Sequence, residues 1–138
     1  MKMNEFSIDI RVYIEDTDAG GIVYYANYLK FLERARTEFM RFLGINKPAL
    51  MQDAQLVVVD LNLRYLSPAL LDDSLKVTVS LKELKRASFW IEQRVFRDND
   101  ILIDGKVRLA ALENKSKKLI ALPKKVKSCL EKIEIIKE

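Results

Sequence analysis

Apolar and polar side chains alternate over several separate stretches of the chain, a pattern typical of strands with one buried face. In the first stretch the buried positions are expected at Ile8, Ile10, Val12 and Ile14. The alternation covers residues 8–14, 57–65, 75–81 and 89–95, and residues 101–112 complete a set of five predicted strands.

Turn-forming residues lie between the later strands. Ser67-Pro68 and Asp72-Asp73 lie between the second and third strands, and Asp98-Asn99-Asp100, between the fourth and fifth, is predicted to be a tight hairpin turn. Such short connections favour antiparallel neighbours. Gly105, inside the last strand, is expected to mark a β-bulge.

Two stretches have the spacing of a helix instead. The long apolar stripe between the first two strands consists of Tyr28, Leu32, Ala35, Phe39 and Phe42. Gly44 stands where a C-cap is expected to end this helix. Pro123 is expected in the first turn of a final helix, whose stripe consists of Val126, Cys129, Leu130, Ile133 and Ile136.

The order of these elements predicts an α+β domain. A helix of about 16 residues spans about 24 Å, which suits one helix lying across a curved antiparallel sheet better than a helical bundle. The length of 138 residues suits one domain covering 1–138. Edge strands and leftover apolar surface favour a homo-oligomer.

The composition excludes several kinds of chemistry. The chain has no histidine and one cysteine, Cys129, so it lacks Ser-His and Cys-His nucleophile pairs, the usual zinc sites and an internal disulfide. The N-terminus shows no signal-peptide pattern, and no apolar run is long enough to span a membrane. We therefore expect a cytoplasmic protein without membrane insertion.

The net charge of +4 comes from one segment. Residues 113–138 hold eight lysines against four acids, whereas basic and acidic side chains balance over residues 1–112. This segment is either a solvated helix face or a surface that attracts a phosphate-bearing ligand. It lacks interleaved aromatic residues, so we expect no nucleic-acid binding.

The segment from Glu15 to Gly21 places three acids and two glycines between a strand and a helix. Glycines allow close backbone approach, and a helix N-terminus offers N–H donors that can stabilise an oxyanion. Asp18 could supply a carboxylate beside them. A plain turn with Asx hydrogen bonds, a cation-binding loop and a helix N-cap are the alternatives. The further ligands of a calcium loop do not follow, so no metal is expected.

Residues 12–38 carry a specific family resemblance. This run, from Val12 to Glu38, resembles hotdog-fold acyl-CoA thioesterases of the 4-hydroxybenzoyl-CoA thioesterase class, and within it the bacterial Tol-Pal-associated YbgC type. The resemblance continues through residues 64–69, Asp72-Asp73, residues 87–89 and Leu122-Pro123. It therefore extends over nearly the whole chain.

The resemblance implies a hotdog fold, in which an antiparallel sheet of about five strands wraps around one long central helix. It also implies a homodimer or homotetramer with active sites between subunits. The reaction would be hydrolysis of acyl-CoA to a carboxylic acid and CoA, with CoA as part of the substrate and no cofactor. A non-catalytic module that binds acyl-CoA or acyl-carrier protein is the alternative.

Two residues match the catalytic positions of the family. Asp18 matches the catalytic aspartate, acting as nucleophile or general base, and the main-chain N–H of Tyr25 matches the group that polarises the thioester carbonyl. Most YbgC-type relatives carry histidine where this chain has Tyr25, whereas the 4-hydroxybenzoyl-CoA enzymes carry tyrosine. We expect this difference to change the acyl preference.

Five more residues are candidates for substrate binding. Tyr24 lines the acyl pocket or packs in the core. Lys85, Arg86 and Ser88 lie together at a turn. Their two cations and one hydroxyl either bind the CoA phosphates or pantetheine amides or belong to an ordinary solvated loop. The same two alternatives apply to Arg64, which lies on a strand.

Two residues near the start of the long helix have alternative roles. Glu33 is either a second catalytic carboxylate or a surface residue paired with Arg36 or Thr37. Asn27 is expected to form hydrogen bonds at the helix start.

Overall fold

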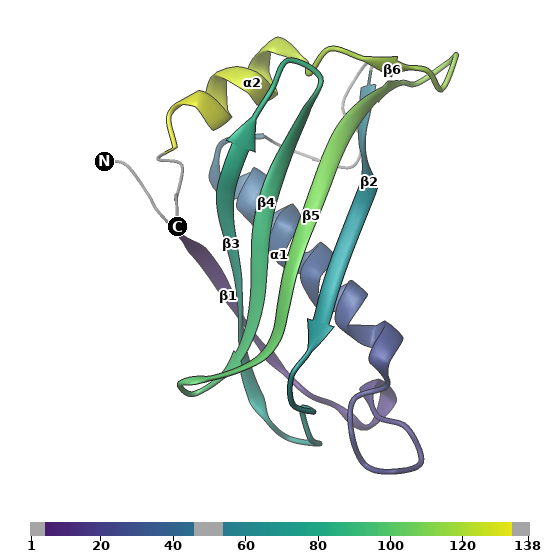
Figure 1. The fold of residues 1–138 in the computed structure, drawn as a ribbon, viewed down its shortest axis with the longest axis vertical. Helices are drawn as coiled ribbons and strands as arrows, with labels where there is room; N and C mark the ends of the chain where they lie inside the picture. The colour runs from purple at the N-terminus through teal and green to yellow at the C-terminus, as the bar shows by residue number, and fades with distance from the viewer. Residues whose placement is uncertain (1–4, 46–53, 134–138) are drawn as a thin grey trace.

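One antiparallel sheet curves around the long helix α1 in this computed structural model, which describes residues 5–45 and 54–133 (Figure 1). The strands are β1 (Phe6–Arg11), β2 (Ala54–Tyr65), β3 (Ser74–Leu84), β4 (Ser88–Arg97), β5 (Asp100–Glu113) and β6 (Leu119–Ile120). The helices are α1 (Tyr28–Phe42) and α2 (Lys124–Glu131), together with the 3-10 helices η1 (Ile14–Asp16) and η2 (Tyr25–Asn27). The predicted hotdog architecture is confirmed.

The sheet has six strands in the order β1-β3-β4-β5-β2, and the short β6 pairs with β5. Every pairing is antiparallel. The predicted hairpin between β4 and β5 is present, because Arg97 pairs with Asp100 and Asp98 adopts a left-handed φ of 54°. Strand β6 was not predicted, since two residues are too few to show a period.

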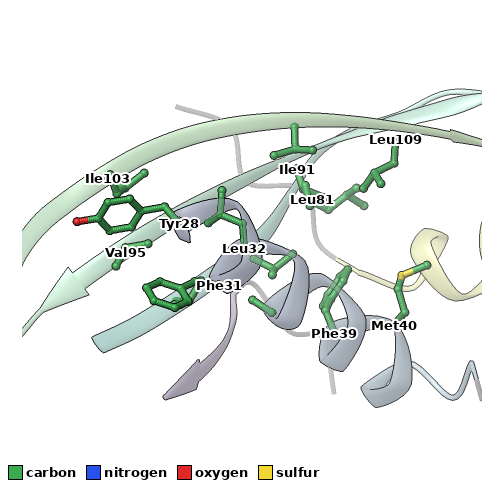
Figure 2. Close-up of a cluster of buried hydrophobic side chains, with 14 of the residues drawn as sticks. Tyr28, Phe31, Leu32, Phe39, Met40, Leu81, Ile91, Val95, Ile103 and Leu109 are labelled. Carbon is green, nitrogen blue, oxygen red and sulfur yellow. The ribbon is translucent and has the colours of Figure 1, made fainter. Parts of the chain in front are cut away.

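The core lies between α1 and the concave face of the sheet. Figure 2 shows helix residues Tyr28, Phe31, Leu32, Phe39 and Met40 facing sheet residues Leu81, Ile91, Val95, Ile103 and Leu109. Burying such a side chain contributes about 2 kcal/mol. The predicted helix stripe is thus correct up to its last member. Phe42 is 62% exposed, and its ring packs against the Phe6 ring with 5.4 Å between the two centroids.

The first strand is shorter than its alternation predicts. It ends at Arg11, and Ile14 opens η1 with its side chain 76% exposed. The reason is a competing local hydrogen bond, because the carboxylate of Asp16 accepts the N–H of Tyr13 at 2.8 Å and turns the chain. Placing Ile14 on the buried face of a strand was therefore wrong.

Gly105 does not mark a bulge. It pairs regularly with Leu63 on one side and Gln93 on the other, and the register shift beside it falls at Leu102 instead. A Cβ at position 105 would lie 2.6 Å from the Leu63 Cδ2 atom. A larger residue here would therefore require the Leu63 side chain to shift.

Helix α2 begins directly after Pro123, as predicted, and covers one end of the sheet (Figure 1). Val126, Leu130 and Ile133 are buried and Cys129 is partly buried, whereas Ile136 lies outside the described residues. In the described part of the chain, no helix is both long and apolar enough to cross a membrane.

Strand β2 forms one edge of the sheet, with β5 as its neighbour. Its pairing with β5 is regular up to a bulge between Val58 and Asp60. Because no further strand covers this edge in the described chain, Val58, Val59 and Leu61 are 39–43% exposed. The predicted strand is correct, but these apolar positions are exposed.

Candidate active site

The chain reverses direction in a tight loop at residues 18–22, between the paired residues Thr17 and Val23. The N–H of Asp18 donates to the Ile22 carbonyl at 2.9 Å, and the N–H of Gly21 donates to the Asp18 carbonyl at 3.1 Å. Gly21 has a φ of +79°, a left-handed conformation that glycine adopts without strain. This geometry explains one of the two glycines.

The Asp18 carboxylate is exposed at the start of this loop. Its Oδ1 atom accepts the Gly20 N–H at 2.8 Å, which is the Asx turn considered among the alternatives. This bond occupies one lone pair of one oxygen, and no other hydrogen bond to the side chain is present within the described residues. The turn therefore fixes the carboxylate and leaves Oδ2 open to a ligand.

The neighbouring acid Asp16 is structural. Its side chain is 9% exposed, and its main-chain carbonyl accepts both the Tyr24 N–H at 3.0 Å and the Asn27 side-chain amide at 2.9 Å. Asn27 thus has the hydrogen-bonding role predicted for it. These bonds join the Asp18 loop to the start of the helix.

Tyr25 is the first residue of η2, the 3-10 turn that leads into α1. The first N–H groups of a helix have no partner inside the helix, and the hydrogen bonds found in the described chain include none from the Tyr25 N–H. The next N–H to be bonded is that of Asn27, which donates to the Tyr24 carbonyl at 2.8 Å. A main-chain donor is therefore available beside the loop.

A cleft of about 450 Å³ lies between the loop, η2 and the end of β2. It is lined by Asp18, Ile22, Val23, Tyr24, Tyr25, Tyr28, Tyr65, Leu66, Ser67 and Pro68. Within the described chain, Asp18 supplies the one carboxylate of this lining. The predicted pair of Asp18 and Tyr25 and the predicted pocket residue Tyr24 are therefore brought together.

Four tyrosines surround the cleft, and sequence reasoning did not assign two of them, Tyr28 and Tyr65, to a site. The rings of Tyr24 and Tyr25 are 4.9 Å apart, and the Tyr65 ring lies 6.4 Å from Tyr25 and 5.8 Å from Tyr28. These distances suit tilted and edge-to-face aromatic contacts.

Three phenol groups of this cluster, those of Tyr24, Tyr28 and Tyr65, are stabilised in their neutral form. Hydrogen bonding with Tyr25 raises the pKa of Tyr24. Burial raises the pKa of Tyr28, although the Ala69 N–H that its oxygen accepts acts in the opposite direction. Burial also raises the pKa of Tyr65. Near neutral pH, these three side chains are therefore hydroxyl donors and not bases.

The turn formed by Lys85, Arg86 and Ser88 lies at the far end of the sheet from the cleft (Figure 1). Strand β3 runs from the cleft end to this turn, and its 11 residues cover about 36 Å at about 3.3 Å per residue. Lys85 and Arg86 are exposed and Ser88 is partly buried. Within one chain, the structure does not bring these three residues to Asp18.

Arg64 and Glu33 also lie outside the cleft lining. Arg64 is exposed on β2, and because strand side chains alternate it points to the sheet face opposite that of Tyr65. Glu33 is exposed on α1 and accepts a hydrogen bond from the Thr37 hydroxyl at 3.2 Å, as its surface role predicts. Among the described residues, no group of three His, Cys, Asp or Glu side chains is arranged to hold a metal.

Comparison with known proteins identifies the class that this fold and cleft define. The family profile of the thioesterase superfamily matches residues 20–103. The chain therefore belongs to the thioesterase superfamily.

Relatives within this superfamily narrow the assignment. The chain is 42% identical over 133 residues to the acyl-CoA thioesterase YbgC of Haemophilus influenzae, a match that covers 95% of this chain and 98% of that protein. It is 37% identical over 128 residues to the acyl-CoA thioester hydrolase YbgC of Escherichia coli, with 91% and 96% covered. The chain thus belongs to the YbgC family of acyl-CoA thioesterases.

A solved structure supports the same fold. A probable thioesterase from Bartonella henselae superimposes with a TM-score of 0.79 at 32% identity, over 87% of this chain and 98% of that chain.

Proposed function

We propose that this chain hydrolyses acyl-CoA thioesters in the tyrosine-lined cleft, with Asp18 as the reacting carboxylate. The observation that supports this role most directly is its position, since Asp18 is the cleft's carboxylate and is held by the Gly20 N–H with one oxygen open. The chain has no histidine. Because their pKa values are raised, the three tyrosines Tyr24, Tyr28 and Tyr65 keep their hydroxyl protons near neutral pH and do not act as bases. A carboxylate is thus the available base or nucleophile.

The Tyr25 N–H is the proposed donor to the thioester oxygen. It lies at the first residue of η2, where main-chain donors point away from the helix and a partial positive charge collects. Negative charge develops on the thioester oxygen as the carbonyl carbon is attacked. A fixed donor stabilises the larger negative charge of the transition state more than the smaller charge on the thioester oxygen of the bound substrate. Removing one such donor typically lowers kcat by about 100-fold to 1000-fold.

Two routes are chemically complete with these groups. In the first, an Asp18 oxygen attacks the thioester carbon, the C–S bond breaks and CoA leaves as a thiolate, after which water hydrolyses the mixed anhydride. In the second, Asp18 takes a proton from water while that water attacks the same carbon, and the proton passes to the departing thiolate. Both routes yield a free carboxylic acid and CoA without a cofactor.

Two copies of the chain are part of this proposal. The edge strand β2 has unpaired main-chain groups and exposed Val58, Val59 and Leu61, features that favour pairing with a second sheet edge. Pairing would also allow the turn of Lys85, Arg86 and Ser88 of a second copy to approach the cleft and hold the CoA phosphates. Sedimentation in solution tests this, because a fully active monomer would contradict it.

The acyl group is the open part of the proposal. A gentisyl-coenzyme A thioesterase of known structure superimposes with a TM-score of 0.81 at 27% identity, over 88% of this chain and 98% of that chain. Four tyrosine rings around the cleft suit a flat aromatic acyl group, and the same apolar lining suits an aliphatic one. An aromatic acyl-CoA therefore belongs in any test of activity.

The deciding experiment measures release of free CoA thiol from short, long and aromatic acyl-CoAs. We expect turnover on at least one of them, and at least a 1000-fold lower kcat for Asp18→Asn with an unchanged melting temperature. Asp9→Asn, which changes an exposed carboxylate on β1, is the matched control. Undiminished turnover in Asp18→Asn would exclude Asp18 as the reacting group.

Binding of acyl-CoA without turnover on every substrate would instead identify a non-catalytic binding module. The same experiment with acyl-carrier protein as the acyl carrier tests whether that protein is a partner. A cytoplasmic location, where both carriers occur, belongs to the same proposal.

A further inference from the structure

Tyr65, the last residue of β2, makes a direct contact with the turn that carries the proposed oxyanion donor. Its hydroxyl donates a hydrogen bond of 3.1 Å to the main-chain carbonyl of Tyr25. The two residues are 40 positions apart in the chain. The contact therefore joins the edge strand of the sheet to η2, on the wall of the cleft.

The Tyr65 ring is held in place by its neighbours. It packs edge-on against Tyr25 at 6.4 Å and against Tyr28 at 5.8 Å. Tyr28 is itself fixed, because it is 2% exposed and its oxygen accepts the Ala69 N–H at 2.9 Å. The hydroxyl of Tyr65 is thus directed at Tyr25 by a ring that has two aromatic contacts.

We propose that Tyr65 is a positioning residue for thioester hydrolysis, which it assists by holding the Tyr25 main chain in the orientation that aims its N–H into the cleft. The inference rests on the proposed function of Asp18 and the Tyr25 N–H. The carbonyl that Tyr65 holds and the donor N–H belong to the same residue, so rotation of the η2 turn would move both. A donor displaced by a fraction of an ångström loses much of its effect on the transition state.

The hydrogen-bonding state of Tyr65 suits this role. Burial, and to a smaller extent the charge of a neighbouring Tyr25, raise the pKa of Tyr65. The hydroxyl consequently keeps its proton over the neutral range and stays a donor. Because the side chain is 49% exposed, water can solvate the Tyr25 carbonyl when this hydroxyl is removed, and the fold loses little.

The test is Tyr65→Phe, which keeps the ring and its aromatic contacts and removes the hydroxyl. We expect about a 10-fold lower kcat, a KM within about twofold of wild type and an unchanged melting temperature, since loss of a transition-state donor lowers kcat selectively. Tyr13→Phe is the matched control, because Tyr13 is 62% exposed and lies outside the cleft lining. It should leave both constants unchanged.

A spectroscopic measurement separates positioning from a general structural effect. In the Asp18→Asn background the thioester stays intact, and the C=O stretching frequency of bound benzoyl-CoA reports how strongly the carbonyl is polarised. We expect it to lie below the value in water, and to return toward that value when Tyr65→Phe is added. Wild-type kcat in Tyr65→Phe, an unshifted frequency, or a change confined to KM would overturn the positioning role.

Failure of the proposed function gives a different result. If wild type shows no turnover, or Asp18→Asn keeps it, the proposal for Asp18 fails before Tyr65 is considered. If wild type is active and Asp18→Asn is inactive, the Tyr65→Phe result alone decides the inference.

Discussion

The side-chain amide of Asn27 lies 2.9 Å from the main-chain carbonyl of Asp16, to which it donates a hydrogen bond. The same carbonyl accepts the Tyr24 N–H, so one oxygen connects the acidic loop, the turn before the helix and the residue that precedes α1. We expect this connection to set the relative position of Asp18 and the Tyr25 N–H. Neither Asp16 nor Asn27 belongs to the cleft lining.

Removing this connection should weaken both catalysis and the fold. We expect Asn27→Ala to lower the free energy of unfolding by about 1 kcal/mol, the usual net value of one hydrogen bond, and to lower kcat several-fold. Denaturant unfolding and steady-state kinetics measure the two effects. Asn99→Ala, in the exposed turn between β4 and β5, should leave kcat unchanged. Equal kinetics for the two variants would show that the connection does not position the site.

A side chain at position 105 should destabilise the sheet. A Cβ added to this residue would lie 2.6 Å from Leu63 Cδ2 and 3.2 Å from the Gln93 carbonyl oxygen, so Gly105→Ala must displace the Leu63 side chain and crowd the β4 backbone. Overpacking of this kind costs about 1–3 kcal/mol. Denaturant unfolding should show this loss, and a smaller loss for the same change made in a Leu63→Ala background. An identical loss in both backgrounds would exclude the Leu63 contact as its cause.

Tyr28 should make stability depend on pH in the alkaline range. Burial raises its folded-state pKa above the ordinary value of 10.0. Below pH 10 both states are protonated and the contribution is fully present, whereas at higher pH the unfolded state ionises first and stability falls until the folded pKa is passed. Unfolding free energies measured from pH 9 upward should therefore decline more steeply for wild type than for Tyr28→Phe. Parallel curves would contradict this assignment.

Periodicity was sufficient to predict the long helix and the main strands, because each buries one face over many residues. It failed where a local hydrogen bond or a single contact decides the geometry. The alternation through Ile14 cannot reveal that the Asp16 carboxylate captures the Tyr13 N–H. Nor can the sequence around Gly105 reveal that a Leu63 methyl group occupies the space above it.

The site shows the same division. The residues of the loop predict acids beside a helix start, but only the family resemblance distinguishes Asp18 from Asp16. The structure adds a physical reason, since Asp16 is buried and bonded whereas Asp18 is exposed in the cleft. The sequence gives no sign that Tyr65 belongs to the site, because its position in the alternating pattern fits an ordinary strand. Its contact with Tyr25 depends on how two elements distant in the sequence pack together.

The place of β2 at the sheet edge also has a consequence for how the protein is made. Ala54 at its start pairs with Glu113, about 60 residues later, whereas β3, β4 and β5 follow one another as hairpins. During synthesis β2 therefore leaves the ribosome before its pairing strand exists, and contacts between distant residues form late. Until then its apolar residues, among them the exposed Val58, Val59 and Leu61, are open to contact with chaperones.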